Sequence, residues 1–340
     1  LLASITAPQH NVAYSYETNR NLMTIIDNQA SGGSSSVSTY TYSYDALGRR
    51  TAREQSLDIA GQTSTDTDTF AYNPRSEVEG STNSDTTNKA GAEWNPSYQY
   101  DQIGNRKSST GVSPVSAYTT NELNQYTAID SASPNHDADG NLIADGGNWT
   151  YTWNNENRLV EADNYDRDPS AAPADLPDAN GETWISFTYD YQGRLVEKQV
   201  RKYEGGTFTE TTERYAYDGW NRIATFSLNS SLLNLNFTFL WGLDLSGSMQ
   251  GAGGVGGLLK ETKNQEPVTT NLYPLYDANG NIMQKLDGTG NVLMDVEYDP
   301  FGNMVSGTLV GEYGFSTKPL VGSILMYYYG FRYYDPVTGR

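Results

Sequence analysis

The stretch "GAGGVGGLL" at residues 251–259 carries a glycine pattern associated with nucleotide binding. Gly251, Gly253 and Gly256 fit G-x-G-x-x-G, in which bare backbone can approach the pyrophosphate of a dinucleotide. Such a site also needs a helix that begins at the glycines, and "LLKETKN" is the only stretch downstream that could start one. We therefore favour a tight crossing of backbones within a β-sheet over a nucleotide site.

Two other stretches, "DADGN" (137–141) and "DANGN" (277–281), begin like a calcium-binding loop. Each places Asp or Asn at the first, third and fifth positions, where such a loop supplies oxygen ligands. The loop would close with Glu at the twelfth position, but Asn148 and Gly288 stand there. Turn chemistry explains the same residues, so we assign no metal ligand.

Asp299 and Asp335 are each followed by proline, and together they could form a carboxylate pair for acid–base chemistry. Both also occupy the turn position of a repeat, which favours a structural role. A serine–histidine triad would have to use His10 or His136, and no G-x-S-x-G stretch accompanies them. We therefore predict no catalytic or cofactor-binding residue, no cofactor, and a chain that is not an enzyme.

The composition argues against several other classes of protein. The 340 residues include 41 acidic and 22 basic side chains, and the net charge of −19 disfavours binding to nucleic acid phosphates. No segment approaches the roughly 20 apolar residues that a membrane-spanning helix needs. Without cysteine there are no disulfides or thiolate metal sites. The 26 tyrosines and 33 glycines favour strands separated by turns.

An internal repeat underlies this composition. The clearest copies are "YSYETNRNL" (14–22), "YSYDALGRR" (42–50) and "YQYDQIGNR" (98–106), and looser copies continue to "RYYDPVTGR" (332–340). Successive units near the N-terminus lie 28 residues apart, as their second aromatic residues show: Tyr16, Tyr44, Tyr72 and Tyr100. About a dozen units therefore predict an all-β protein made of antiparallel hairpins, with little or no helix.

The physical chemistry of one unit can be read from "YTYSYDALGR". Tyr40, Tyr42 and Tyr44 alternate with small polar residues, so their rings face one side of a strand. Asp45 then opens a turn, because its carboxylate can accept hydrogen bonds from backbone N–H groups ahead of it. Gly48 follows three residues later, where we expect a positive φ.

The turns of these units are our candidate functional residues, in a structural role. We expect a positive φ at Gly193 as well as at Gly48. The tyrosine, aspartate, glycine and arginine positions so assigned are Tyr44, Asp45, Gly48, Arg49, Tyr100, Asp101, Gly104, Tyr189, Asp190, Gly193, Arg194, Tyr276, Asp277, Gly280, Tyr298, Asp299, Gly302, Tyr334, Asp335, Gly339 and Arg340.

Tyr-Asp followed by Gly-Arg or Gly-Asn, recurring in this way, resembles the YD-repeat or Rhs family. That family includes Rhs proteins, wall-associated bacterial toxins, the C components of insecticidal toxin complexes and the animal teneurins. The similarity covers nearly all 340 residues. It is strongest at residues 240–259, 298–303 and 328–340, which look like the Rhs-associated core. The resemblance implies one continuous antiparallel sheet that spirals into a hollow shell.

The resemblance also predicts the organisation of the chain. Residues 1–236 are expected to be a YD-repeat segment with an inserted loop at 163–182, and residues 237–340 the Rhs-associated core, continuous with the same sheet. In toxin members of the family, a self-cleaving segment follows a "DPxTGR"-like stretch. Here that stretch ends at Arg340, so the self-cleavage cannot be carried over.

We expect a structural shell segment of a secreted or cell-surface bacterial protein, which houses a C-terminal toxin or effector and does no chemistry itself. Its partners would be that domain beyond Arg340 or the rest of the shell chain, with no nucleic acid and no membrane span. The alternative is a surface module that binds a glycan or a cell-surface receptor. A weaker alternative is a fragment of an aspartyl autoprotease that uses Asp299 or Asp335.

Overall fold

The computed structural model describes residues 2–7, 9–30, 36–166, 176–229, 232–265 and 267–340. The chain forms two compact units. The first comprises Leu1–Pro114, Phe239–Leu320 and Asp335–Arg340, and the second comprises Val115–Thr238 and Val321–Tyr334. Within the described ranges the regular structure is β-strand, apart from one 3₁₀ turn, η1 (Phe315–Thr317). No helix in these ranges is long and apolar enough to span a membrane.

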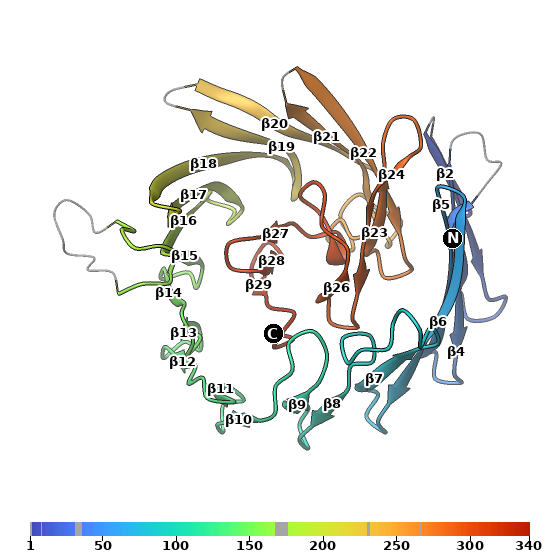
Figure 1. Cartoon of the computed structure of the whole chain (residues 1–340), viewed down its shortest axis with the longest axis horizontal. Helices are drawn as coiled ribbons and strands as arrows, with labels where there is room; N and C mark the ends of the chain where they lie inside the picture. Colours follow the sequence, from blue (N-terminus) through green and yellow to red (C-terminus); the bar gives the residue numbers. More distant parts are fainter. Residues whose placement is uncertain (1, 8, 31–35, 167–175, 230–231, 266) are drawn as a thin grey trace. The chain divides into compact units, whose positions relative to one another are not determined.

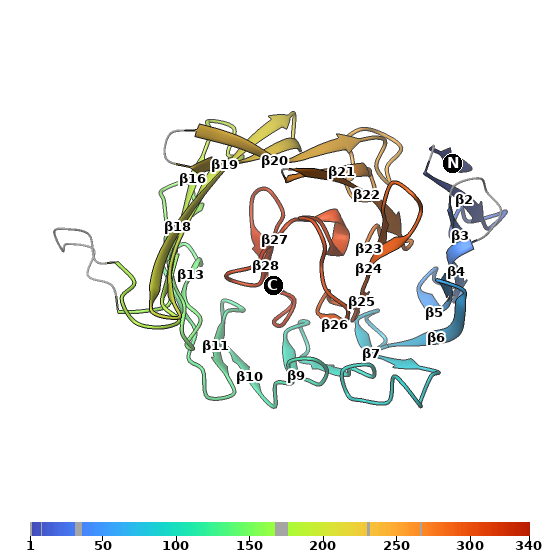
Figure 2. The same ribbon diagram turned by 45° about the horizontal axis from the view of Figure 1, so that its top comes forward.

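The N-terminal part of the first unit is a seven-stranded antiparallel sheet in chain order (Figure 2). Its strands are β1 (Ser4–Thr6), β2 (His10–Tyr16), β3 (Met23–Ala30), β4 (Ser36–Tyr44), β5 (Arg50–Ile59), β6 (Gln62–Tyr72) and β7 (Val78–Asn83). Tyr40 and Tyr42 are buried on one face of β4 while Thr41 between them is exposed. The alternation predicted from the sequence therefore sets which face of this sheet is covered.

The rest of the first unit consists mainly of further strands. They are β8 (Tyr98–Tyr100), β9 (Arg106–Ser109), β21 (Leu258–Gln265), β22 (Val268–Tyr276), β23 (Ile282–Leu286), β24 (Val292–Asp295), β25 (Glu297–Tyr298) and β26 (Met304–Ser306). Leu275 and Leu286 of β22 and β23 pack with Val37 of β4 in a small apolar cluster. The strands from the C-terminal half of the chain therefore contact the N-terminal sheet within this unit.

The second unit continues the pattern of strand, turn and strand (Figure 1). Its strands are β10 (Tyr118–Thr120), β11 (Tyr126–Ile129), β12 (Asn135–His136), β13 (Leu142–Ala144), β14 (Thr150–Trp153), β15 (Leu159–Asp163), β16 (Thr183–Tyr189), β17 (Leu195–Glu204), β18 (Thr207–Asp218), β19 (Asn221–Asn229), β28 (Met326–Tyr328) and β29 (Tyr333–Tyr334). Two more strands, β20 (Leu232–Trp241) and β27 (Leu320–Val321), span the boundaries between the unit ranges.

The core of the second unit is aromatic and aliphatic. Ile185, Phe187 and Leu195 are buried against Tyr328 from the C-terminal part of the chain. The hydroxyl of Tyr328 also accepts a hydrogen bond from the Leu195 N–H at 3.0 Å. Burial raises the pKa of Tyr328, so this hydroxyl stays protonated at neutral pH.

The prediction of an all-β fold with antiparallel hairpins is confirmed. The predicted continuity is wrong for the described residues, because the pairs β8–β9, β10–β11 and β25–β26 form separate small sheets. The order β1 to β7 also has two ends, so that sheet does not close on itself. Short strands and the long loop between β7 and β8 interrupt the ladder.

The predicted inserted loop corresponds to the connection between β15 and β16, and its residues 167–175 lie outside the described residues. The predicted boundary between residues 236 and 237 stays a prediction. The two compact units follow contacts in space, and the second unit also takes in residues 321–334.

Candidate functional site in the repeat turns and a buried charged cluster

The turn after β4 shows how one repeat is built. The N–H groups of Leu47 and Arg49 both donate to Asp45 Oδ1 at 2.9 Å, and the Gly48 N–H donates to the Asp45 carbonyl at 3.0 Å. Arg49 Nε donates to the other carboxylate oxygen at 2.6 Å. Partial burial acts to raise the pKa of Asp45, but the bonds from Arg49 outweigh it and hold the pKa below its ordinary value.

The same arrangement recurs at the other turn aspartates. The carboxylate accepts the N–H groups two and four residues ahead, at 2.8–3.0 Å, for Asp101, Asp190, Asp277 and Asp299. The glycine three residues after the aspartate has φ between +72° and +95° at Gly48, Gly104, Gly193, Gly280 and Gly302. The positive φ predicted for Gly48 and Gly193 is therefore confirmed.

The last turn departs from the pattern. The Val337 N–H donates to Asp335 Oδ1 at 2.8 Å, but the glycine, Gly339, is four residues after the aspartate instead of three. Its φ is +73°, and the Asp335 N–H donates to the carbonyl of Arg340 at 2.7 Å. "YDPVTGR" is thus one residue longer between Asp and Gly than the other units, and it forms a wider turn.

Tyrosines that precede a turn also contact the preceding repeat. The Tyr44 hydroxyl donates to the carbonyl of Met23 at 2.6 Å, and the Tyr72 and Tyr100 hydroxyls donate to the carbonyls of Arg50 and Val78 at 2.8 Å. Tyr189, Tyr217 and Tyr276 make the equivalent bond to Leu159, Leu195 and Leu258. Sequence reasoning missed this contact, although the constant 28-residue interval was its signal.

The arginines at the turns contact the following repeat. Arg49 Nη1 donates to the Asn73 carbonyl at 3.3 Å, and its guanidinium lies 5.0 Å from the centre of the Tyr72 ring. Arg194 likewise donates to the Gly219 carbonyl at 2.6 Å and lies over the ring of Tyr217. These tyrosines therefore donate hydrogen bonds to the preceding repeat, and the arginines donate to the following repeat. Such turns hold the neighbouring repeats in position.

Removing one tyrosine hydroxyl tests this coupling. Tyr44→Phe should lower the free energy of unfolding by about 1 kcal/mol, because the Met23 carbonyl loses its donor while the ring is kept. Denaturant unfolding followed by circular dichroism measures the loss. Tyr191→Phe is the control, since that side chain is 92% exposed, and it should leave the midpoint unchanged. Equal effects from the two variants would contradict the role of this hydrogen bond.

The glycine segment does not have the structure of a nucleotide site. Strand β21 follows the glycines at Leu258, where a helix would be required. The N–H groups of Ala252 and Gly254, at 2.7 and 3.1 Å, donate to Asp244 Oδ2. A carboxylate of the chain itself therefore takes the donors that a phosphate would need, and it adds a negative charge there.

These glycines instead permit close backbone contact. A Cβ added to Gly280 would lie 2.5 Å from Val255 Cγ1 and 3.0 Å from the nitrogen of Gly256. Thr317 Oγ1 accepts the Gly256 N–H at 2.8 Å and donates to the Gly280 carbonyl at 2.7 Å. The crossing predicted from the sequence is confirmed, with the glycine segment against the turn at 277–281.

The space around this crossing can be probed with one methyl group. Gly280→Ala should destabilise the protein by about 2–4 kcal/mol, because strain from the positive φ adds to the clash with Val255 and Gly256. Gly61→Ala is the matched control: its φ is +75°, and nothing lies within 4 Å of an added Cβ. It should cost about 1 kcal/mol from strain alone. Thermal unfolding of both variants compares the two costs, and equal losses would contradict the close approach.

Asp299 is buried and Asp335 is half-buried, and burial raises the pKa of each despite hydrogen bonds from their own turns. Tyr98 donates to Asp299 Oδ2 at 3.2 Å. The two turns are joined by Asn303, whose Nδ2 donates to Asp299 Oδ2 at 2.8 Å and to the Pro336 carbonyl at 3.0 Å. Both carboxylates serve their own turns, and an autoprotease role for them stays a prediction.

The other residues singled out from the sequence lie in separate places. Asp137 accepts the N–H groups of Asp139 and Asn141, as a turn residue does. His10 is buried beside Tyr273, and burial lowers its pKa. His136 lies on β12 in the second unit. In the ranges that the structure describes, no group of three or more acidic or histidine side chains is placed to hold a metal ion.

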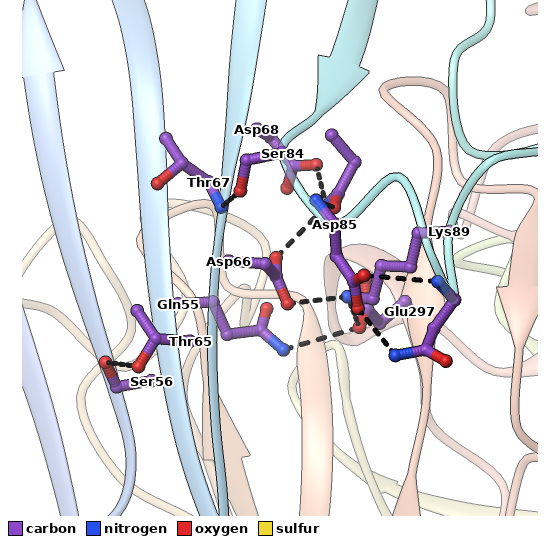
Figure 3. Close-up of polar contacts among 12 residues, drawn as sticks. Gln55, Ser56, Thr65, Asp66, Thr67, Asp68, Ser84, Asp85, Lys89 and Glu297 are labelled. Atoms are coloured by element: carbon purple, nitrogen blue, oxygen red, sulfur yellow. Dashed lines mark hydrogen bonds and ion pairs between the residues drawn. The ribbon is translucent and has the colours of Figure 1, made fainter.

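A buried charged cluster in the first unit was not found from the sequence. Lys89, from the loop between β7 and β8, lies between two carboxylates: its Nζ is 2.8 Å from Asp66 Oδ2 and 2.5 Å from Glu297 Oε1 (Figure 3). Arg53 lies between another two, at 2.5 Å from Asp68 Oδ2 and 3.8 Å from Asp277 Oδ2. We call these six residues the bridged cluster: Arg53, Asp66, Asp68, Lys89, Asp277 and Glu297.

Beside the bridged cluster lies a cavity of about 60 Å³. Arg50, Asn279 and Trp94 contribute to its lining together with members of the cluster. Arg50 Nη1 donates to Asn279 Oδ1 at 3.1 Å and lies over the ring of Tyr42. The cavity has room for one or two water molecules, which is far below the volume of a typical small-molecule site.

The chain is similar in sequence to proteins named as tRNA nucleases, and in fold to solved structures that include a Tc holotoxin pore. No family model matches the chain. It is 26% identical over 252 residues to the tRNA3(Ser)-specific nuclease WapA of Bacillus spizizenii, which covers 71% of this chain and 9% of that protein. It is 25% identical over 251 residues to the tRNA nuclease WapA of Bacillus subtilis, again 71% of this chain and 9% of the relative.

The fold matches solved structures over almost its whole length. The crystal structure of TcdB2-TccC3-Cdc42 gives a TM-score of 0.72 at 16% identity, over 97% of this chain and 17% of that one. The Photorhabdus luminescens Tc holotoxin pore gives 0.72 at 16% identity, over 98% and 16%. The chain thus spans about 9% of the curated relatives and about 17% of these solved chains.

The repeat turns, the antiparallel all-β fold and these similarities agree on one class of protein, in which Tyr-Asp repeats build a β-sheet wall. The resemblance to the YD-repeat or Rhs family that the sequence predicts is confirmed by these relatives and by the shared fold.

Proposed function

We propose that this chain is a wall segment of a bacterial YD-repeat shell, secreted or displayed at the cell surface, that encloses a toxin or effector domain of the same protein. The segment itself supplies structure and no chemistry. The main observation behind this proposal is the similarity of fold to TcdB2-TccC3 over 97% of the chain. The toxin relatives and the coupling of each turn to its neighbours support it.

The wall role has a physical basis in the turns. A wall around a cargo has to resist local opening, and every repeat that bonds its neighbours adds to that resistance. Bonds from tyrosine hydroxyls and arginine side chains to backbone carbonyls link consecutive repeats at 2.6–3.3 Å. We propose that the repeat-turn residues act in this way throughout the chain.

The test uses the full-length protein, with the sequence of its gene on both sides of residues 1–340 determined first. A domain downstream should resist added protease in the intact protein. It should become sensitive when a protease site engineered into the exposed β5–β6 hairpin, at Gly61, is cut. The same site placed in a flexible linker after the wall is the control. A downstream domain that is equally sensitive before and after wall cleavage would contradict encapsulation.

A second function is supported by one observation. Phe331 is 63% exposed and packs against Trp220, with 4.5 Å between ring centres and a tilt of 47° between the rings, and both rings belong to the second unit. Exposed aromatic faces of this kind can bind sugars or a receptor, and we propose glycan binding as the alternative. Phe331→Ala should abolish retention on a glycan array, and Phe208→Ala, another exposed phenylalanine of this unit, should not. Absence of retention by the unmodified chain would exclude this function.

A further inference from the structure

The bridged cluster joins two layers of the first unit that carry charge of the same sign. Asp66 and Asp68 lie on β6, and Asp277 and Glu297 lie on the C-terminal part of the chain. Each cation of the cluster lies between two carboxylates, one from each layer. Without the two cations, the facing carboxylates would repel each other in a place with little water.

The cluster does not balance its charge. Two cations, Arg53 and Lys89, face four carboxylates, which leaves an excess of two negative charges among these six side chains. All six side chains are between 2% and 12% exposed. An excess of like charge at this degree of burial is unfavourable, because solvent screens it poorly.

Neutral side chains donate hydrogen bonds to these carboxylates but leave the net charge unchanged. Asn83 Nδ2 donates to Asp66 Oδ1 at 3.0 Å and to Asp68 Oδ1 at 2.8 Å. Gln55 Nε2 lies 3.5 Å from Glu297 Oε1 (Figure 3). The charged groups acting on Glu297 are Lys89, Arg53 and Asp66. The other titratable groups around the cluster and its cavity are Tyr40, Tyr42, Arg50, Glu93, Asp295, Tyr298 and Asp299.

We propose that the bridged cluster is a pH-dependent contact between strands β5–β7 and the C-terminal segment that carries Asp277 and Glu297. Uptake of a proton by Glu297 in mild acid relieves the excess charge and tightens the contact. Loss of that proton toward neutral pH loosens it, and the loop 84–96 that carries Lys89 opens more often. This behaviour belongs to the wall itself and does not depend on any cargo.

The direction follows from the cluster's own titration. Burial raises the pKa of Glu297 above its ordinary 4.5, although Lys89 and Arg53 act to lower it. Burial also acts to lower the pKa of Lys89, but Glu297 and Asp66 outweigh it and raise that pKa. Both shifts mean that the closed contact holds protons more strongly than the open one. Closure is therefore favoured in acid, and it weakens as the pH rises from 4.5 to the pKa of Glu297 in the closed state.

The turn carboxylates act in a different pH range. The pKa of Asp45, Asp101 and Asp190 is lowered from 3.8, since hydrogen bonds to each carboxylate outweigh partial burial. Their contribution is complete above pH 3.8 and is lost as the pH falls through the lowered values. The tightening at the bridged cluster is therefore separable from acid unfolding of the turns.

Hydrogen exchange measured by mass spectrometry on residues 1–340, between pH 4.5 and 8 and corrected for the intrinsic exchange rate, tests the proposal. Protection of peptides from 84–96 and 295–303 should fall by about threefold or more as the pH rises. Glu297→Gln removes the titrating charge at the centre of the cluster, so protection in this variant should be high and should change less with pH than in the unmodified chain. Asp66→Asn removes the charge of the other carboxylate that contacts Lys89 and so lowers the excess negative charge. This variant should show a weaker pH dependence.

Glu54→Gln is the matched control, because Glu54 is exposed and adjacent to Arg53 on the same strand, β5. It should keep the pH dependence of the unmodified chain. Circular dichroism at each pH establishes that every variant is folded. Protection that does not change with pH in the unmodified chain would overturn the proposal, as would an unchanged pH dependence in both Glu297→Gln and Asp66→Asn.

Discussion

Lys285→Met is expected to lower the free energy of unfolding by about 3–5 kcal/mol, because it leaves a buried carboxylate without its cation. The Lys285 and Glu261 side chains are both 0% exposed, and Lys285 Nζ lies 2.5 Å from Glu261 Oε1. Nζ also donates to the carbonyls of Val310 and Tyr313 at 2.6 and 2.8 Å. Denaturant unfolding followed by tryptophan fluorescence measures the loss.

The second carboxylate oxygen of Glu261 accepts the Glu312 N–H at 2.8 Å, so this ion pair also holds residues 310–313 against the strands. Replacing both partners, Lys285→Met with Glu261→Gln, should recover part of the loss, because no unpaired charge remains. Lys263→Met, at an exposed position on β21, should change stability by less than about 0.5 kcal/mol. A loss no larger than that of Lys263→Met would show that the buried pair contributes little.

Arg53→Met is the second large effect, with an expected destabilisation of about 3–5 kcal/mol. Its Nε and Nη2 donate to Asp68 Oδ2 at 3.0 and 2.5 Å, and Nη1 lies 3.8 Å from Asp277 Oδ2. Burial works against the charge of Arg53, but Asp68 and the other carboxylates outweigh it and raise the pKa. Thermal unfolding should show a lower midpoint, and hydrogen exchange should show faster opening of β6.

Two further variants separate charge from shape at this site. Arg53→Met with Asp68→Asn should be more stable than Arg53→Met alone, since one of the unpaired carboxylates is neutral. Arg214→Met removes an exposed ion pair with Glu197, whose side chains are 48% and 32% exposed, and should change stability by less than about 1 kcal/mol. Equal losses from Arg53→Met and Arg214→Met would contradict the role of burial.

The sequence by itself determined the strands, the turns and their spacing, because the interactions that make them are local. Asp45 bonds groups two and four residues ahead, and the positive φ of Gly48 is set within the same turn. Alternating tyrosines decide which face of β4 is covered. Such features follow from short-range stereochemistry, so they were predicted without knowledge of the fold.

The pairing of Arg53 with Asp68 depends on both local and tertiary structure. The two residues are cross-strand partners in the β5–β6 hairpin, so the register of that hairpin brings them together. Their burial was not predictable, because it depends on the C-terminal segment that packs over this face of the sheet.

Only the tertiary structure decided the bridged cluster and the glycine crossing. Lys89 and Glu297 are 208 residues apart in the chain, and nothing in their local sequences distinguishes them from exposed charges. Gly256 and Gly280 meet because the segments that carry them cross, and Lys285 and Glu261 pair across the intervening strand β22. Contacts between distant segments depend on how the hairpins stack, which one repeat cannot encode. For that reason the bridged cluster could be identified only in the folded chain.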